Sequence, residues 1–438
     1  MINKNISNIK KNNLCMGCGA CIAICPNEAI KLIIDNNKGI YIPKIDLKEC
    51  NECSLCYEIC PGQGVDFNNI NRELFKKQPK NPLIGNYLNC YVGHSTNYNI
   101  RYNSSSGGLI TQILIFALEE GIIDGALVTR MKKDNPLEPD PFVARNREEI
   151  IEASKSKYCP VPLNFGLKEI LKSKNGEKFA VVGLPCHIHG IRKAEKINRK
   201  LKEKIELHMG IFCGMTPNFL GTKFLLDKYE IKEETVKNIN YRGNGWPGSM
   251  SIELNNNDKL LLNDYWDSSF GLHFFTPNRC LLCNDGLCEL ADISFGDPWI
   301  TEFSNEKIGK SIIITRTKNS EKILKLMNNK DLITLNKINP EKIVQSQQGM
   351  LYFKKKLFKK NSRLFKSIPK YIIYDKLVDA NSIDLLISLF PYINSNLYSN
   401  AYLKKILPKI PSILLKLYGL PYFFLVRNKS KKDFKKFL

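Results

Sequence analysis

Two cysteine runs near the start of the chain constrain its fold more than any other feature. The runs are Cys15-x-x-Cys18-x-x-Cys21-x-x-x-Cys25 and Cys50-x-x-Cys53-x-x-Cys56-x-x-x-Cys60, and a proline follows each. This spacing is typical of the ligands of [4Fe–4S] clusters. A zinc ribbon or a disulfide framework is a weak alternative, because both runs are complete and end in Cys-Pro.

The runs also predict how the ligands divide between two clusters. With this spacing, the fourth cysteine of each run ligates the other cluster. The first cluster is therefore expected on Cys15, Cys18, Cys21 and Cys60, and the second on Cys50, Cys53, Cys56 and Cys25. Between the runs, β-prone residues on either side of Asn36–Gly39 favour a hairpin. Residues 1–66 are thus predicted to form an α+β ferredoxin module with two clusters.

Length and composition indicate further domains behind this module. The chain has 438 residues, of which 43% are hydrophobic and 25% charged, which is ordinary for globular proteins. Thiolate clusters need a reducing compartment and no signal peptide precedes Cys15, so a cytoplasmic location is expected. The net charge of +22 favours anionic partners. Nucleic acid is not an expected partner, because no nucleic-acid-binding motif is present.

A second domain is predicted over residues 89–345, after a polar linker at residues 67–88. It contains two strand–cysteine–helix units in series, in which predicted strands at 179–184 and 205–212 lead to Cys186 and Cys213. Ligands of parallel α/β sheets bind at the carboxyl ends of the strands. The pattern therefore predicts an α/β domain with a mixed or parallel sheet, and it places both cysteines at the ligand-binding edge.

A third cysteine group, Cys280-x-x-Cys283-x-x-x-x-Cys288, offers three thiolates on one loop. A further [4Fe–4S] cluster would need a fourth cysteine from elsewhere. Cys186, which is held in a turn that contains a proline, is the favoured donor, and Cys213 is the alternative. The same thiols could hold zinc, but zinc is redox-inert and would serve a chain with two electron-carrying clusters less well.

A serine- and glycine-rich turn at residues 103–108 precedes a helix predicted over residues 109–120. A serine is expected to cap this helix, and the two glycines permit close approach of a ligand. Backbone N–H groups at a helix start form a site for phosphate. One-electron clusters need a two-electron converter if they serve an organic substrate, and a flavin is the usual converter.

Residues 346–438 are predicted to be a basic, mainly helical region. No stretch of about 18–20 residues is free of charge, so no membrane span is expected. Residues 401–426 are apolar but contain lysines and prolines. A helical tail docked on the main domain is favoured. The alternative is a membrane-surface helix pair, which would give a peripheral membrane contact.

Several motifs together resemble the beta-subunit family of the coenzyme F420 (deazaflavin) hydrogenases and dehydrogenases. They are the Ser105-Ser106-Gly107-Gly108 turn, Gly183-Leu-Pro-Cys186, Gly210-Ile-Phe-Cys213-Gly214, Arg242-Gly-Asn-Gly-Trp-Pro-Gly248, the Cys280/Cys283/Cys288 loop and Ala291-Asp-Ile-Ser-Phe-Gly-Asp297. They occur in the family's order over about residues 89–345. The family includes deazaflavin-dependent sulfite reductase and plant-type hydroxymethyl-chlorophyll reductase, in which a two-cluster ferredoxin module precedes the same flavin domain.

The resemblance implies FAD, one [4Fe–4S] cluster in the flavin domain and hydride exchange with a deazaflavin or another organic substrate. It implies an FAD and substrate site formed by Ser105, Ser106, Gly107, Gly108, Lys157, Tyr158, Arg242, Gly243 and Gly245. Two departures leave the substrate open. His187-Ile-His189 stands where many members have glutamine, and the basic region after about Lys354 lies mostly outside the family core.

These observations predict an oxidoreductase that exchanges electrons between a ferredoxin-type carrier, or a partner subunit, and a hydride partner. Its expected cofactors are three [4Fe–4S] clusters and FAD, and coenzyme F420 is the first candidate for the hydride partner. One alternative is a reductase of another organic substrate, for which relatives linked to surface-polysaccharide synthesis are a precedent. Another is a pure electron-relay subunit. No side-chain nucleophile is expected, because the cofactors carry the chemistry.

Overall fold

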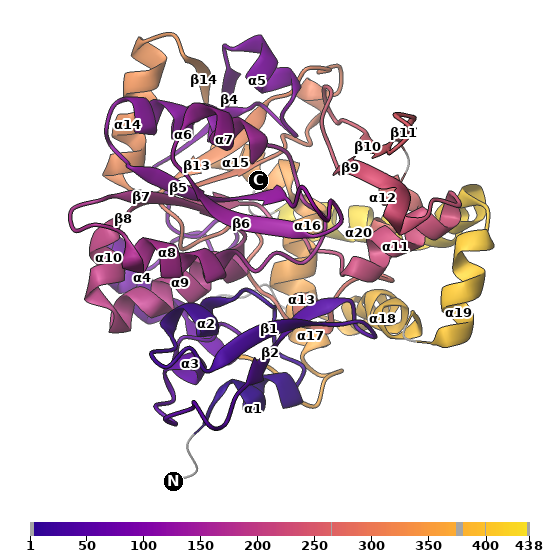
Figure 1. Ribbon diagram of the computed structural model, residues 1–438. Coiled ribbons are helices and arrows are strands. Elements are labelled where there is room, and N and C mark those ends of the chain that lie inside the picture. The colour runs from indigo at the N-terminus through magenta and orange to yellow at the C-terminus, as the bar shows by residue number, and fades with distance from the viewer. Residues whose placement is uncertain (1–3, 264, 374–379, 399, 436–438) are drawn as a thin grey trace.

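An eight-stranded mixed sheet forms the centre of the molecule (Figure 1). The computed structural model describes residues 4–263, 265–373, 380–398 and 400–435, so residues 1–3 and 436–438 of the predicted terminal domains lie outside the described residues. The strand order is β14-β4-β13-β12-β8-β7-β5-β6. The strands are β4 (Asn89–Ser95), β5 (Gly125–Met131), β6 (Pro139–Ala144), β7 (Phe179–Gly183), β8 (Ile205–Ile211), β12 (Ile293–Gly296), β13 (Ser311–Thr315) and β14 (Ile333–Ile338).

The four strands in the order β12-β8-β7-β5 are parallel, and the strands on either side of them pair antiparallel. The predicted α/β domain with a mixed sheet is therefore confirmed. Cys186 follows β7, Cys213 follows β8 and Asp297 follows β12. Because the carboxyl ends of parallel strands share one edge of a sheet, these three residues lie at the same edge.

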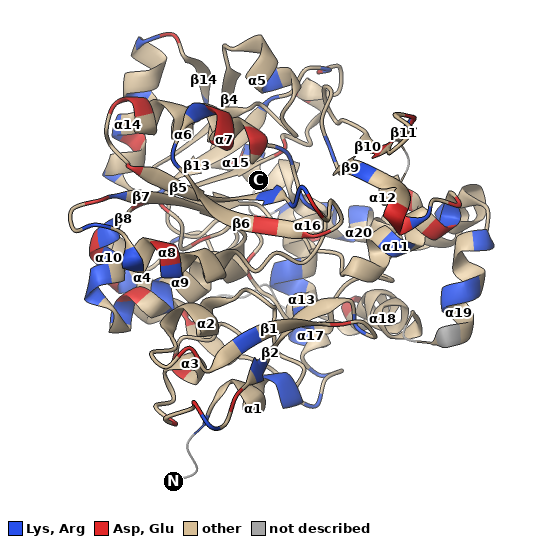
Figure 2. Ribbon diagram, in the orientation of Figure 1, with Lys and Arg blue, Asp and Glu red and all other residues tan. Residues whose placement is uncertain are grey.

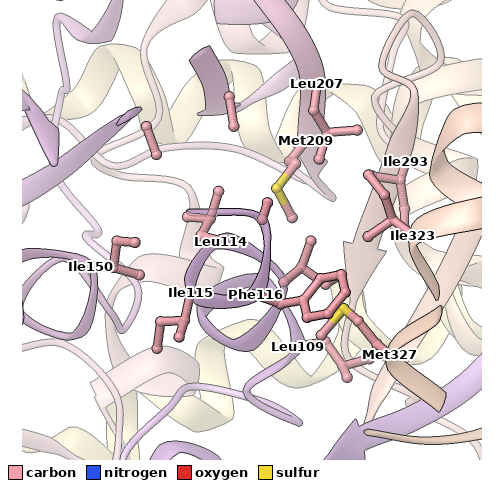
Figure 3. Packing of buried hydrophobic residues seen from close by; sticks show 14 of the residues in the cluster. Leu109, Leu114, Ile115, Phe116, Ile150, Leu207, Met209, Ile293, Ile323 and Met327 are labelled. Atoms are coloured by element: carbon pink, nitrogen blue, oxygen red, sulfur yellow. The ribbon is translucent and has the colours of Figure 1, made fainter. Parts of the chain in front are cut away.

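Helices cover both faces of the sheet (Figure 1). One face carries α6 (Leu109–Glu119), α7 (Arg147–Glu152) and α14 (Lys318–Asn329), and the other carries α8 (Leu167–Lys172), α9 (Pro185–Ile197) and α10 (Arg199–Lys204). Figure 3 shows the first interface, where Phe116 of α6 and Met327 of α14 pack with Met209 of β8. Helix α6 is apolar at most positions, as expected for a helix buried against a sheet.

The N-terminal module packs against the layer of helices α8 and α9. It contains α1 (Ile6–Lys11), α2 (Ala20–Ile24), α3 (Leu55–Glu58) and the strands β1 (Ile30–Asp35), β2 (Ile40–Ile45) and β3 (Gly64–Asp66). The predicted hairpin is confirmed, because β1 and β2 pair antiparallel. Ala20 and Ile59 share a buried cluster with Ile188 and Ile191 of α9. Hydrophobic burial therefore joins the module to the sheet domain.

Residues 67–88, expected to be a linker, are folded. Helix α4 (Phe67–Phe75) begins after Asp66, whose carboxylate accepts a hydrogen bond from the Asn69 N–H at 2.9 Å. Ile70 is buried on the inner face of this helix, and Leu83 further on is completely buried. Prolines and polar residues dominate the sequence of this segment and therefore predict a linker. The helical spacing of the few apolar residues at 67–75 is the one sequence feature that indicates α4.

The remaining elements lie beside and behind the sheet edge. They are α5 (Tyr98–Tyr102), α11 (Phe219–Lys228), β9 (Val236–Asn240), β10 (Met250–Leu254), β11 (Lys259–Leu262), α12 (Tyr265–Ser268) and α13 (Asn278–Leu281). The C-terminal region adds α15 (Pro340–Ser346), α16 (Gln348–Leu351), the π-helix η5 (Tyr352–Leu357), α17 (Phe358–Asn361), β15 (Lys370–Ile372), α18 (Ser382–Leu397), α19 (Ala401–Ile406) and α20 (Ser412–Phe434).

The C-terminal region is docked on the rest of the chain. Strand β15 pairs in parallel with β3 of the N-terminal module. The Tyr422 hydroxyl lies 3.2 Å from Nε2 of His273, and the Asn394 side-chain amide donates to the Leu272 carbonyl at 2.8 Å. Within the described residues no single helix has the length and apolar character to cross a membrane, although Tyr402–Lys409 and Ser412–Phe434, bent by 105°, satisfy those criteria together.

A buried ionic network ties α9 to the sheet. An oxygen of the Asp292 carboxylate lies 3.1 Å from Arg192 Nη2, and its other oxygen lies 2.9 Å from His208 Nδ1. Nε2 of His208 lies 2.6 Å from Glu195. Burial alone would raise the pKa of the Asp292 carboxyl, but Arg192 and His208 hold it well below its ordinary value. The stabilisation is therefore present above about pH 4 and is lost as the pH falls further.

Replacing Asp292 with Asn should lower the free energy of unfolding by about 2–3 kcal/mol, because Arg192 and His208 would each lose one of their two buried carboxylate partners and keep only Glu195. The matched control is Glu203→Gln, which breaks the exposed ion pair of Glu203 with Arg199 and should cost less than about 1 kcal/mol. Anaerobic denaturant unfolding measures both variants. Equal small losses would show that the network is not a main source of stability.

Candidate iron–sulfur and flavin site

The first predicted cluster position is a cavity inside the N-terminal module. Four cysteines line it: Cys15, Cys18, Cys21 and Cys60. The N–H groups of Gly17 and Gly62 donate to the sulfurs of Cys15 and Cys60, each at 3.3 Å. Gly17 has a φ of +67°, and a Cβ atom there would lie 2.9 Å from Tyr41. Only glycine therefore allows the loop to close around the cavity.

The thiols of this cavity hold their protons tightly when no metal is bound. Burial, followed by the proximity of Cys60, raises the pKa values of the Cys15 and Cys18 thiols to about 12. Burial and the neighbouring thiols also raise the pKa of Cys21. Metal ligation requires thiolates, so a cationic centre must displace these protons. A buried group of four thiols is the donor set that an iron–sulfur cluster uses.

The second predicted set lies beside the first and reaches the surface. Burial raises the pKa of the Cys56 thiol, and Cys53, Cys25 and Cys50 raise it further. Cys53 is exposed, whereas Cys25 and Cys50 are half-buried. The structure thus groups Cys60 with the first run and Cys25 with the second, as the spacing predicts. The role of these cysteines as ligands stays a prediction.

The α/β domain contributes a third group of thiols at the carboxyl edge of the sheet. Its five members are Cys186, Cys213, Cys280, Cys283 and Cys288. Burial raises the pKa of Cys186, and the next contribution comes from Cys18, so the first and third groups adjoin. Cys288 lies against β8, where a Cβ atom on Gly210 would be 2.6 Å from its sulfur. Both candidate fourth donors, Cys186 and Cys213, therefore belong to this group.

The spacing of these thiols bears on the zinc alternative. In the described part of the chain, no three His, Cys, Asp or Glu side chains converge closely enough to bind a single metal ion. Thiolates around one Zn²⁺ each lie about 2.3 Å from it, which forces the sulfurs together. A cube holds its ligand sulfurs further apart, one at each iron corner. The choice of a cluster over zinc for this group stays a prediction.

Two buried cations lie among the thiols. Arg279 is 3% exposed, and its guanidinium donates to the Pro61 carbonyl at 2.9 Å and to the Leu282 carbonyl at 3.0 Å. Lys354 of η5 is 1% exposed and donates to the Cys280 carbonyl at 3.0 Å. Buried charges require partners of opposite sign. Ligand thiolates would supply that charge, and neither cation was predicted from the sequence.

The position of each cation determines which thiols it affects. Arg279 opposes the rise in pKa of the Cys15 and Cys18 thiols in the first group and of Cys280 in the third. Lys354 opposes the rise in pKa of Cys213 and Cys280. Arg279 therefore lies between two groups of thiols, and Lys354 belongs to the third. The position of Arg279 immediately before Cys280 is the one feature of the sequence that indicates a cation near the thiols.

The start of α6 differs from the predicted serine cap. Helix α6 is capped by Gly108, which has left-handed backbone, and no side chain accepts its first N–H groups. Ser104 instead donates to the Ile100 carbonyl at 2.6 Å, and Ser106 donates to the Lys310 carbonyl at 2.5 Å. The predicted cap is wrong because these backbone carbonyls compete for the hydroxyls. The N–H groups at the helix start remain suited to a phosphate.

The residues that the resemblance assigns to the flavin site come together beside this helix start. The Ser156 N–H donates to Ser105 Oγ at 2.8 Å. This hydrogen bond joins the serine- and glycine-rich turn to the loop that carries Lys157 and Tyr158. Two segments that are about fifty residues apart in the sequence are therefore held at the same end of α6.

Backbone hydrogen bonds bring the loop at residues 242–248 to the same place. The Gly245 N–H donates to the Tyr102 carbonyl at 2.9 Å, so this loop contacts the residue that ends α5. The next N–H along the chain, that of Trp246, donates to the Lys307 carbonyl at 2.7 Å. Four loops therefore meet at one end of α6. They are the serine- and glycine-rich turn, the loop that carries Lys157 and Tyr158, the 242–248 loop and the loop that contains Lys307.

Arg242 and Asp297 form the ionic centre of this site. The guanidinium pairs with both carboxylate oxygens of Asp297, at 2.7 and 3.1 Å, and also donates to the Pro247 carbonyl at 2.9 Å. Trp246 Nε1 donates to the same carboxylate at 2.8 Å. Since Asp297 follows β12, the pair fixes the 242–248 loop at the carboxyl edge of the sheet. Asp297 ends one of the motifs quoted above, but its role was not predicted from the sequence.

Lys157 lies in the site but is tied to its own loop. Its Nζ atom donates to the carbonyls of Ala153 and Ser154, both at 2.6 Å. Burial lowers the pKa of Lys157 to about 7. The ring of Tyr158 packs against Trp266, with 5.3 Å between the ring centroids. Lys157 thus shapes the loop that carries Tyr158.

His187 and His189, the departures from the family pattern, have structural partners. His187 Nε2 lies 2.9 Å from the Val161 carbonyl oxygen, and His189 Nε2 lies 2.8 Å from the buried Asp285 carboxylate. Asp285 belongs to the loop between Cys283 and Cys288. His189 therefore holds the third cysteine loop against α9, and both rings act as hydrogen-bonding groups.

Thiol groups in a ferredoxin module and at the edge of an α/β sheet define an iron–sulfur oxidoreductase. The chain matches the model of the 4Fe-4S dicluster domain over residues 14–63. It also matches the model described as coenzyme F420 hydrogenase/dehydrogenase, beta subunit, with the N-terminal part over residues 90–168 and the C-terminal part over residues 176–341.

Individual relatives agree with these matches. The coenzyme F420 hydrogenase subunit beta of Methanosarcina barkeri is 30% identical over 243 residues, which are 53% of this chain and 80% of that protein. The coenzyme F420-dependent sulfite reductase of Methanocaldococcus jannaschii is 28% identical over 396 residues, 86% of this chain and 55% of that protein. The chain belongs to the coenzyme F420 hydrogenase/dehydrogenase beta-subunit family, as its motifs predict.

A solved structure shares the fold. A chain of the F420-reducing [NiFe] hydrogenase complex from Methanosarcina barkeri aligns with a TM-score of 0.52 and 24% identity, covering 65% of this chain and 93% of that chain. This likeness supports the fold alone. The family models and the named relatives confirm the prediction of an oxidoreductase.

Replacing Cys60 with Ala should remove the first cluster, and with it about four irons per chain. Cys60 is the predicted fourth ligand of that cluster, even though it lies at the end of the second cysteine run. The matched control is Cys90→Ala, because Cys90 is a buried thiol of β4, remote from the three groups in sequence. Iron analysis of anaerobically purified protein measures both. Equal iron in the two variants would contradict the assignment of Cys60.

Replacing Gly107 with Ala should weaken flavin binding about tenfold, or about 1.4 kcal/mol, and leave the iron content unchanged. The added Cβ atom would lie 2.7 Å from the Gly93 carbonyl oxygen and must displace the turn. In the control, Gly349→Ala, the nearest atom to the new Cβ is 3.8 Å away, on Val426. Flavin release on dilution, followed by fluorescence, measures the difference. Unchanged flavin retention in G107A would remove this turn from the flavin site.

Proposed function

We propose that the chain is an iron–sulfur flavoprotein that exchanges electrons between a one-electron carrier and a hydride partner. Its cofactors would be three [4Fe–4S] clusters and FAD, and its hydride partner would be coenzyme F420. Bound clusters carry single electrons, and bound FAD converts between single electrons and a hydride. The proposed units are a ferredoxin module at residues 1–66, an FAD and iron–sulfur domain at 89–345 and a C-terminal region at 346–438.

The observation that carries this proposal is the continuous series of thiol groups. The second group reaches the surface at Cys53, and its Cys56 adjoins Cys21 of the first group. Cys18 of the first group adjoins Cys186 of the third. The third group lies at the sheet edge that also carries Asp297. A chain of this kind suits electron transfer between the surface and the proposed flavin site.

The ligands we propose follow from the sequence and from this grouping. The first two clusters would be held by Cys15, Cys18, Cys21 and Cys60, and by Cys50, Cys53, Cys56 and Cys25. The third would use Cys280, Cys283 and Cys288 with Cys186, and Cys213 is the alternative fourth donor. Arg279 and Lys354 would stabilise the added negative charge of the ligand thiolates, and burial would exclude water from them.

The backbone at the start of α6 would bind the FAD phosphates. Gly107 and Gly108 allow close approach, and the N–H groups of the first turn would donate to the phosphate oxygens. The ion pair of Arg242 with Asp297 would hold the 242–248 loop over the bound flavin. The ring of Trp246 packs against that of Trp299, with 4.8 Å between the centroids and an interplanar angle of 33°, and Trp299 is half exposed. This aromatic pair is suited to receive the planar ring of a hydride partner.

Coenzyme F420 is the proposed hydride partner because relatives with this domain carry its name. The Methanosarcina relative is named a coenzyme F420 hydrogenase subunit, and the Methanocaldococcus relative is named an F420-dependent sulfite reductase. The net charge of +22 would favour approach of a coenzyme with a phosphate and an acidic tail. The one-electron partner would be a ferredoxin-type carrier or a partner subunit that docks near Cys53.

Anaerobically purified protein should contain about twelve irons per chain and one FAD. On rapid mixing, reduced deazaflavin should bleach the flavin absorbance of the wild type, and G107A depleted of flavin serves as the control. A bound flavin that stays oxidised would eliminate F420 and favour a reductase of another organic substrate. Full iron content with no flavin would instead identify an electron-relay subunit.

A further inference from the structure

Helix α20 is apolar on the face that it presents to solvent. Its inner face is buried and packs on the main domain through Leu415, Gly419 and Tyr422. The exposed apolar side chains of its outer face are Ile413, Leu414, Leu417, Leu420, Phe424 and Leu425. A surface helix normally carries polar residues on its outer face. The composition of α20 therefore indicates that something covers this face.

The apolar surface extends onto neighbouring helices. Helix α18 packs against α20 through the rings of Phe390 and Tyr418, whose centroids are 5.3 Å apart, and it exposes Leu386. Tyr402 of α19, at the edge of the molecule in Figure 1, is 72% exposed. Exposed apolar side chains that gather on neighbouring helices in this way mark an interaction site.

The charge of this region has one sign. No Asp or Glu occurs between Asp384 and Asp433. The basic residues in the same interval are Lys404, Lys405, Lys409, Lys416, Arg427, Lys429, Lys431 and Lys432. In Figure 2, the charged positions of α19 are all basic, whereas α7, α10 and α14 mix both signs. The partner that covers this surface must therefore combine apolar and anionic character.

We propose that α19 and α20 form a docking surface for a bilayer of anionic phospholipids. The outer apolar side chains of α20 would enter the boundary between headgroups and acyl chains, and the lysines would contact the lipid phosphates. A lipid surface supplies both required properties at once. A second copy of this chain would bring the same positive charge to the interface and would be repelled.

The contacts of α20 favour a helix that lies on the membrane over one that crosses it. The Tyr418 hydroxyl donates to Asn394 Oδ1 at 2.7 Å, and the Tyr422 hydroxyl lies 3.2 Å from His273 Nε2. These contacts hold the inner face on the protein, so only the outer face can meet lipid. The bend of 105° between the α19 and α20 segments places α19 at an angle to this face.

The docking surface does not depend on the proposed cofactors. It consists of C-terminal elements, whereas the thiol groups lie in the N-terminal module and at the sheet edge. If the proposal holds, the oxidoreductase works beside a membrane, and its substrate or partner would be within reach of a lipid surface. Failure of the flavin proposal would leave this inference standing, because the two are measured separately.

Flotation of the full-length holoprotein with vesicles tests the inference. Vesicles of phosphatidylcholine alone are compared with vesicles that also contain phosphatidylglycerol, at low and high salt. The wild type should float with the anionic vesicles, and less so at high salt. The double variant Leu417→Asp with Phe424→Asp and the double variant Lys404→Glu with Lys405→Glu should each reduce binding about tenfold or more.

Two matched controls separate a specific surface from general effects. Leu47→Asp adds a charge at an exposed leucine of the N-terminal module, and Lys200→Glu with Lys202→Glu reverses two exposed lysines of α10. Both controls should bind as the wild type does. Iron content and the visible spectrum verify that every variant is folded, and the lysine variants remain informative if the Asp variants do not fold.

Three outcomes would overturn the inference. Wild-type protein that floats with neither type of vesicle would exclude lipid docking. Equal loss of binding in the controls would show that net charge alone is responsible. An oligomer that the Asp variants dissociate, together with no vesicle binding, would assign the apolar face to a second copy of this chain.

Discussion

The structure depends on holding many cysteine thiols close together away from water. Burial raises the pKa values of Cys15, Cys18 and Cys213 to about 12, so without a metal these thiols remain protonated. Iron would replace the protons and leave a buried excess of negative charge. Arg279 and Lys354 are the cations that the fold places beside this charge. Each of these two side chains also donates to a backbone carbonyl in or next to a cysteine loop. The same side chains therefore balance the charge of the ligand thiolates and fix the shape of the loops.

This constraint explains how the parts of the chain are joined. The N-terminal module packs on α9, which begins at the Cys186 turn, and the C-terminal π-helix η5 delivers Lys354 to the third cysteine group. Arg279 contacts the carbonyl of Pro61 in the module from α13 of the α/β domain. The module, the sheet edge and the C-terminal region therefore meet at the thiols. A C-terminal region held in this way can carry a docking surface on its outer side without disturbing the sites within.

Much of this arrangement was predictable because it follows from local spacing. The paired cysteine runs, the hairpin at 30–45 and the strand–cysteine units before Cys186 and Cys213 are local patterns, and the structure contains each of them. Long-range features were not predictable in the same way. Sequence spacing does not show that Lys354 reaches Cys280, that Asp297 pairs with Arg242, or that the serines before α6 donate to distant carbonyls. The sequence of residues 67–88 predicts a linker, because the few apolar residues of this segment become recognisable only as a helical face once they pack on a neighbour.

The most direct test of the proposed electron path through the three thiol groups is anomalous X-ray scattering at the iron absorption edge, from crystals grown without oxygen. Three separate iron sites are predicted: one among Cys15, Cys18, Cys21 and Cys60, one among Cys25, Cys50, Cys53 and Cys56, and one at the group that contains Cys186 and Cys280. Iron at the first two sites with zinc or no metal at the third would contradict the continuous path from the surface to the sheet edge.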